Sequence, residues 1–187
     1  AGGNDYDHSG CTLSKLNRII LLSTAILASY QVVRGIDGLG TMAIACYTIG
    51  FGVIIIASLL IMILGFEVLD SSLVVIASTL IPLSLSLGLI SGYFRTGLIP
   101  FGIFFVVGFC TILITRLTGI KKLAVIVLVF VHGVAGLTIS FLPVILVVRG
   151  IVPAGFVFVS IGGGFKGLGG LLISFLKMGK PVLSRER

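Results

Sequence analysis

The chain has 187 residues, of which 57% are hydrophobic and only 10% are charged, and its mean hydropathy is +1.28. Soluble domains are about 45–50% apolar and about 25% charged, so a soluble fold could not cover this much apolar surface. The formal net charge of +7 suits anchoring to anionic lipid headgroups and gives no reason to expect a nucleic-acid partner. Composition therefore predicts an integral membrane protein.

The apolar runs indicate helices and not the strands of a membrane barrel. Barrel strands alternate apolar and polar residues over about ten positions, whereas residues 53–64 and 123–131 do not alternate. A helix also satisfies its own backbone hydrogen bonds, which lipid cannot do for it. We therefore expect an all-α, polytopic transmembrane helical bundle.

Six stretches approach or exceed the roughly 20 residues that a helix needs to cross a bilayer. They cover residues 18–33, 39–64, 71–93, 98–117, 123–148 and 151–176, and the first is the shortest. Asp70 and Ser71 are suitable residues to cap the third helix. The expected organisation is a polar N-terminal tail (1–17), a transmembrane domain (18–176) and a basic C-terminal tail (177–187).

The distribution of positive charge predicts the orientation of these spans. With six spans, the tails and even-numbered turns share one side of the membrane and carry nine cations: Lys15, Arg18, Arg116, Lys121, Lys122, Lys177, Lys180, Arg185 and Arg187. The opposite turns carry only Arg34, Arg95 and Arg149. Because cytoplasmic loops are enriched in Lys and Arg, both termini are expected on the cytoplasmic or an equivalent side.

A short internal repeat suggests three related helical hairpins. The sequence VVRGI occupies residues 32–36 and again 147–151, and a looser version surrounds Arg95. A Gly-Phe pair follows each arginine, at 50–51, 108–109 and 164–165. The alternative is that arginine and glycine simply suit a short outer turn, one anchoring at headgroups and the other ending a helix.

Glycine accounts for 26 residues, many of them inside the apolar runs. Small residues let helix backbones approach closely in lipid, and the GxxxG pairs Gly88/Gly92 and Gly163/Gly167 have the required spacing. Such helices would contact lipids and either other membrane subunits or further copies of the chain. The alternative is that single glycines are only tolerated within the spans.

Lys166 lies near the middle of the sixth predicted span, among six glycines between residues 162 and 170. A charge at this depth costs about 2.5–3.5 kcal/mol on insertion scales and usually faces a bundle interior, a water-filled cavity or a partner. We expect Lys166 to point inward and form an intramembrane charge or ligand site. The alternative is a lysine that stretches along its helix to the headgroups. The run is not a nucleotide-binding loop, because its spacing differs from that motif.

His132 lies near the middle of the fifth predicted span and is the candidate cofactor ligand. An intramembrane imidazole could ligate a tetrapyrrole, relay protons or form a structural hydrogen bond. The N-terminal residues Asp5, Asp7, His8 and Cys11 are too irregularly spaced for a metal site, so no metal is predicted. Three scattered cysteines do not form a disulfide framework. Bound lipids are the only expected small-molecule ligands besides a tetrapyrrole.

A group of charged residues falls on the side of the membrane where the termini are expected. Glu67 and Asp70 are predicted to form interfacial ion pairs with Arg116, Lys121 and Lys122. A gate or a proton-loading site is the alternative use of these carboxylates.

So few polar residues cannot form a catalytic constellation, so we expect no enzyme. The leading hypothesis is an accessory or structural subunit of a larger membrane complex, for example an energy-converting one. The alternative is a small solute transporter, channel or membrane substrate-binding component, with Lys166 and His132 lining the path.

Overall fold

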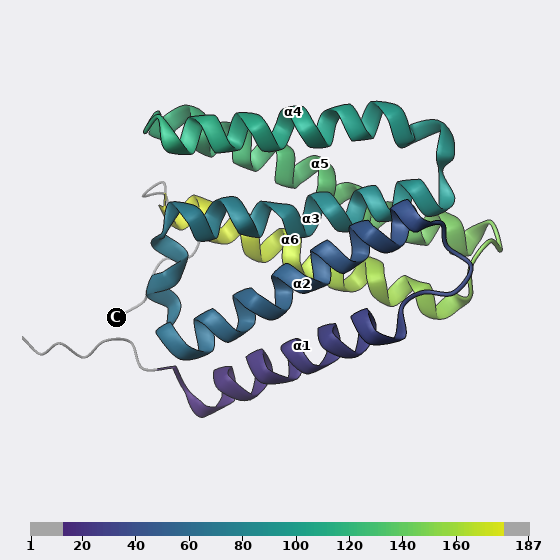
Figure 1. The fold of residues 1–187 in the computed structure, drawn as a ribbon, viewed down its shortest axis with the longest axis horizontal. Coiled ribbons are helices and arrows are strands. Elements are labelled where there is room, and N and C mark those ends of the chain that lie inside the picture. The colour runs from purple at the N-terminus through teal and green to yellow at the C-terminus, as the bar shows by residue number, and fades with distance from the viewer. Residues whose placement is uncertain (1–12, 178–187) are drawn as a thin grey trace, which may run out of the picture.

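The protein is a bundle of six α-helices in which consecutive helices run in opposite directions (Figure 1). The structure is a computed structural model that describes residues 13–177, apart from the side chains of residues 70, 121, 170, 171 and 173–177. The α-helices are α1 (Lys15–Arg34), α2 (Thr41–Leu64), α3 (Ser72–Tyr93), α4 (Leu98–Leu117), α5 (Lys121–Val148) and α6 (Val157–Lys177). The short 3₁₀ helices are η1 (Phe66–Asp70), η2 (Arg95–Gly97) and η3 (Ala154–Phe156). Residues 13–177 contain no strand, so the all-α prediction is confirmed.

Five helices, α1 to α5, are long and apolar enough to cross a membrane. This makes the chain a multi-pass membrane protein by the length and composition of its helices. The sixth helix has 21 residues, but its described apolar part, Ala154–Gly169, is shorter than a full span. Five of the six predicted spans are therefore confirmed by these criteria, and the sixth stays a prediction.

Local capping explains where the observed helices differ from the predicted ones. Helix α1 begins at Lys15, three residues early, because the Ser14 hydroxyl accepts a hydrogen bond from the Asn17 amide at 3.2 Å. Ser71 is the N-cap of α3 as expected, although its side chain forms no capping hydrogen bond. Helix α6 begins at Val157, six residues late. The backbone at Pro153 is extended, and a residue that precedes proline disfavours the helical conformation.

Helix α3 is the central element of the bundle. It packs against α2, α4 and α5, and every residue from 81 to 90 except Leu85 is buried. The buried side chains of Leu83 and Leu89 are almost without exposure. One core cluster joins α3 to α2 and α5 through Tyr47 and Ile139, and a second joins it to α4 and α5 through Ile112. Helices α2, α4 and α5 are thus arranged around α3.

Buried hydroxyl groups in α3 form hydrogen bonds within their own helix. The Thr79 hydroxyl donates to the Ile76 carbonyl at 2.7 Å, and the Ser86 hydroxyl donates to the Pro82 carbonyl at 2.6 Å. Such bonds satisfy a polar group without requiring a neighbouring helix. Ser84 is different, because its buried hydroxyl has no hydrogen-bond partner in the described part of the chain.

The two GxxxG pairs have different surroundings. A methyl group added at Gly88 would come within 3.0 Å of Tyr47 Cε1, and one at Gly92 within 3.1 Å of Leu39 Cδ2. This pair therefore allows α3 to approach α2 and the turn before it. Gly163 faces Ile139 of α5 still more closely, whereas nothing lies within 4 Å of a methyl group at Gly167. The predicted packing role is supported for three of the four glycines.

The first and last helices are peripheral. Among the described residues, α1 packs only against α2, and α6 packs against α5 and the adjoining η3. Large apolar side chains on both helices are exposed, for example Leu27 and Val33 on α1 and Phe158 and Phe165 on α6. Each peripheral helix therefore has a face that no other described element covers.

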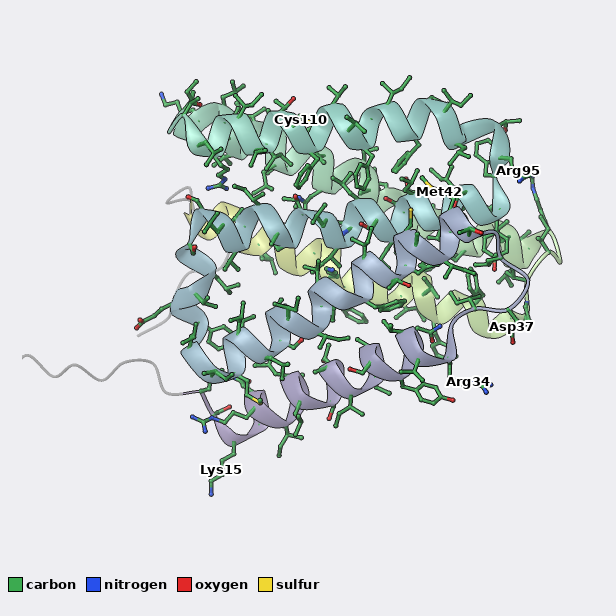
Figure 2. All side chains as sticks on the ribbon, in the orientation of Figure 1. Lys15, Arg34, Asp37, Met42, Arg95 and Cys110 are labelled. Carbon is green, nitrogen blue, oxygen red and sulfur yellow. The ribbon has the colours of Figure 1, made fainter. Side chains whose placement is uncertain are left out.

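The three predicted hairpins correspond to α1–α2, α3–α4 and α5–α6, and their turns lie at the same end of the bundle (Figure 1). Figure 2 shows Arg34 and Arg95 at this end and Lys15 at the other. The first and third turns are alike, because Arg34 and Arg149 are each followed by a glycine with positive φ (65° and 69°). The middle turn instead contains η2, so the repeat is closer between the first and third hairpins.

Candidate functional site

Helices α5 and α6 bring His132 and Lys166 to the same height in the bundle. His132 lies 11 residues after Lys121, the first residue of α5, and Lys166 lies 11 residues before Lys177, the last residue of α6. Because these two helices are antiparallel neighbours, both residues lie roughly 17 Å from the same end by helical rise. Lys166 is close enough for its charge to act electrostatically on the His132 ring.

The His132 ring is oriented by its own helix. Its Nδ1 atom is 3.2 Å from the Leu128 carbonyl oxygen. A carbonyl oxygen can only accept a hydrogen bond, so Nδ1 carries the proton and donates it in this contact. In the neutral ring Nε2 is then the free acceptor, and it is the atom that would ligate a tetrapyrrole or accept a proton. The structural hydrogen bond weighed from the sequence is present, and cofactor binding stays a prediction.

Lys166 is exposed on the surface of the chain, yet it lies close enough to His132 to act on that ring, so its inward orientation stays a prediction. Lys166 is exposed because, in the described part of the chain, α6 contacts α5 and no other helix.

The surface around Lys166 is bare helix backbone. The nearest neighbours on a helix are three and four residues away, and at these four positions the sequence has only glycine, at 162, 163, 169 and 170. Open space also lies beside several glycines of both helices. A methyl group would meet nothing within 4 Å at Gly133, Gly136, Gly162, Gly167 and Gly169. The four nearest positions on α6 therefore supply no side chain that could shield the stem of Lys166.

The predicted ion-pair group lies at the other end from the three arginine turns, where α2, α4 and α6 end. Glu67 and Lys122 are exposed and Arg116 is half-buried, and among the described side chains no ion pair joins them. The Arg116 Nε atom is buried without a hydrogen-bond partner in that same set. The side chains of Asp70 and Lys121 lie outside the described ones, so ion pairs with them stay predictions.

A separate apolar groove of about 450 Å³ lies between α2 and α4, with α3 at its base. Met42, Leu87 and Gly102 are among its lining residues, and Figure 2 shows Met42 on α2 near the start of that helix. This groove could not be predicted from the sequence, because it depends on α2 and α4 both packing on α3 without meeting each other. Its lining includes neither Lys166 nor His132.

No protein-family model matches the chain, and searches among curated proteins and solved structures also found no match. The function is therefore argued from the residues themselves.

Proposed function

We propose that this chain is an accessory or structural subunit of a larger membrane complex and that other membrane proteins bind its peripheral helices. It would act by binding and not by catalysis. The observation that carries the proposal is the exposure of Lys166 near the middle of α6, a helix that packs against no helix but α5 and the short η3 in the described part of the chain.

The energetic argument concerns what surrounds this lysine in a membrane. A lipid-facing charge near mid-bilayer is unfavourable by about 2.5–3.5 kcal/mol on insertion scales. The glycines around Lys166 leave backbone exposed, and bare backbone packs better against another helix than against disordered lipid tails. A partner helix on α6 would remove both unfavourable contacts at once.

The competing proposal is a transporter or channel with a path past Lys166 and His132. A path through a single chain has to run inside the bundle, whereas Lys166 is exposed and the core around α3 is filled. This placement favours the subunit proposal. We also propose that both chain termini face the cytoplasmic or equivalent side, because the two ends of the bundle differ so strongly in Lys and Arg.

The proposal is tested by purifying the tagged full chain from its native membrane in a mild detergent. We expect heterologous membrane subunits to remain bound in fixed stoichiometry. Subunits that carry redox cofactors or pigments would identify an energy-converting complex. A chain that purifies alone and moves a solute across proteoliposome membranes would contradict the proposal.

A matched pair of variants assigns the binding to α6. Gly162→Leu adds bulk where the structure has open space, so the chain should fold normally but lose its partner. Ala45→Leu adds bulk to an exposed position on α2 and should keep the partner. If both variants lose the partner, or if neither does, the assignment of the binding face to α6 is contradicted.

A further inference from the structure

We propose that the partner on this face of α6 is a transmembrane helix of a different protein, and that this helix places a carboxylate opposite Lys166. The inference rests on the proposed function and adds the chemistry of the partner. It follows from the charge at Lys166, from the positions of the chain's own acidic residues and from the bare surface around the lysine.

Among its described residues, the chain has no carboxylate at the depth of Lys166. Its six acidic residues are Asp5, Asp7, Asp37, Glu67, Asp70 and Glu186. Asp37 lies in the turn after α1, and Glu67 and Asp70 lie in η1 between α2 and α3, so these three are at the ends of the bundle. The other three belong to the tails. His132 is close to Lys166, but a histidine carries no negative charge that could balance an ammonium group.

The same positions exclude a second copy of the chain as the neutralising partner. A second copy that packs on α6 at the same membrane depth brings only its own spans, and none of these has a carboxylate near its middle. Intramembrane charges are usually paired with one another or with backbone carbonyls. A carboxylate that pairs with Lys166 at this depth is therefore expected on another protein.

Lipid phosphate is the other anion that a membrane offers, but it lies at the wrong depth. Lys166 is nine residues from the start of α6 and 11 from its end, roughly 14 and 17 Å by helical rise. To reach the headgroups its stem would have to lie along a helix surface of glycines that offers it no side-chain contact. The same glycines allow another helix to approach closely enough for direct pairing with the amine.

A synthetic peptide can test the pairing without the native partner. The purified full chain is reconstituted in neutral phosphatidylcholine vesicles with a fluorescent transmembrane helix of leucine and alanine that has one central glutamate. Matched peptides carry glutamine or leucine at that position. Energy transfer between labels on the chain and the peptide measures binding. We expect the glutamate peptide to bind roughly tenfold more tightly than the leucine peptide, as intramembrane polar contacts allow.

Variants of Lys166 then identify the group responsible. Lys166→Met should abolish the preference for glutamate, and Lys166→Arg should keep it. Lys166→Glu should reverse the preference, so that a peptide with central lysine binds best. Equal binding of the glutamate and leucine peptides to the unmodified chain would overturn the proposal and assign the amine to lipid headgroups. A preference that persists in Lys166→Met would also overturn it.

The two proposals can fail separately. Native subunits that stay bound to Lys166→Met would overturn the carboxylate pairing and leave the subunit function standing. A chain that has no native partner but shows the charge-dependent peptide binding would overturn the subunit function, while the pairing chemistry at Lys166 would stand.

Discussion

Gly163 offers a direct test of the contact that holds α6 to the bundle. A methyl group at this position would lie 2.6 Å from Ile139 Cγ2 and 3.3 Å from Ile139 Cβ. Carbon atoms in favourable contact are about 3.5–4.0 Å apart, so Gly163→Ala requires α5 and α6 to separate by about 1 Å. Ile139 cannot easily turn aside, because a β-branched side chain in a helix has one strongly preferred rotamer.

The expected cost follows from these distances. Overpacking a filled contact destabilises by about 1–3 kcal/mol, and replacing glycine in a helix with alanine returns about 0.5–1 kcal/mol. We therefore expect Gly163→Ala to lower the free energy of unfolding by about 1–2 kcal/mol. The control is Gly162→Ala, one residue away, where a methyl group meets nothing within 4 Å. It should leave stability unchanged or raise it slightly.

The measurement is unfolding in dodecylmaltoside micelles with increasing SDS, followed by circular dichroism. The reasoning is refuted if the two variants have the same midpoint, because the α5–α6 contact would then tolerate a methyl group. It is refuted equally if Gly162→Ala is the less stable variant.

Three further predictions concern the turns, the core and the topology. Gly35 ends α1 at φ 65° and ψ −164°, a conformation that is essentially restricted to glycine. Gly35→Ala should therefore lower the free energy of unfolding by about 1–3 kcal/mol in the same SDS titration. Gly40→Ala is the control and should change it little, because Gly40 has φ −70°. Ser84→Ala removes a buried hydroxyl without a described partner, so it should be neutral or stabilising; a loss above about 1 kcal/mol would reveal a hydrogen bond to that hydroxyl. In a background without the native cysteines, a cysteine at Ser14 or Thr118 should react with an impermeant thiol reagent from one side of the membrane, and a cysteine at Asp37 or Thr96 from the other. Labelling of Ser14 and Asp37 variants from the same side would contradict the arrangement of α1.

The sequence predicted the helices well because the membrane fixes their length and composition. The predicted and observed bounds of α4 agree at both ends, and those of α2, α3 and α5 differ by at most two residues. The start of α6 was wrong because hydropathy does not register the effect of Pro153 on the preceding backbone. Apolar residues on either side of that proline look the same in composition.

Which helix is central could not be predicted from hydropathy. The best windows of α2, α3 and α4 have mean hydropathies of 2.5, 2.3 and 2.5, yet α3 is largely buried and the others are not. Apolar residues suit lipid and protein neighbours equally well, so hydropathy cannot distinguish them. The buried Thr79, Ser84 and Ser86 were the available signal, since hydroxyls prefer contact with protein.

The residues of the candidate site were named from the sequence, and the structure adds how they lie relative to each other. Sequence alone identified Lys166 and His132 as the intramembrane polar residues. Their proximity and the exposure of Lys166 depend on which helices cover α6, and pairings between helices are long-range contacts that a hydropathy pattern does not encode. The expected inward lysine was argued from the cost of a charge that faces lipid, which does not say which helices cover α6; in the described part of the chain, α1 and α6 do not meet.

The burial of α3 has a consequence for how the protein is made. Membrane helices are inserted in the order of synthesis and then associate laterally, but the final neighbours of α3 include α5, which is synthesised after α4. Helix α3 must therefore spend time in the bilayer before its surroundings are complete. During this time the hydroxyls of Thr79 and Ser86 need no neighbouring helix, because they donate hydrogen bonds to carbonyls of α3 itself. The hydrogen bonds of these two hydroxyls can thus form while the newly inserted helix is still surrounded by lipid.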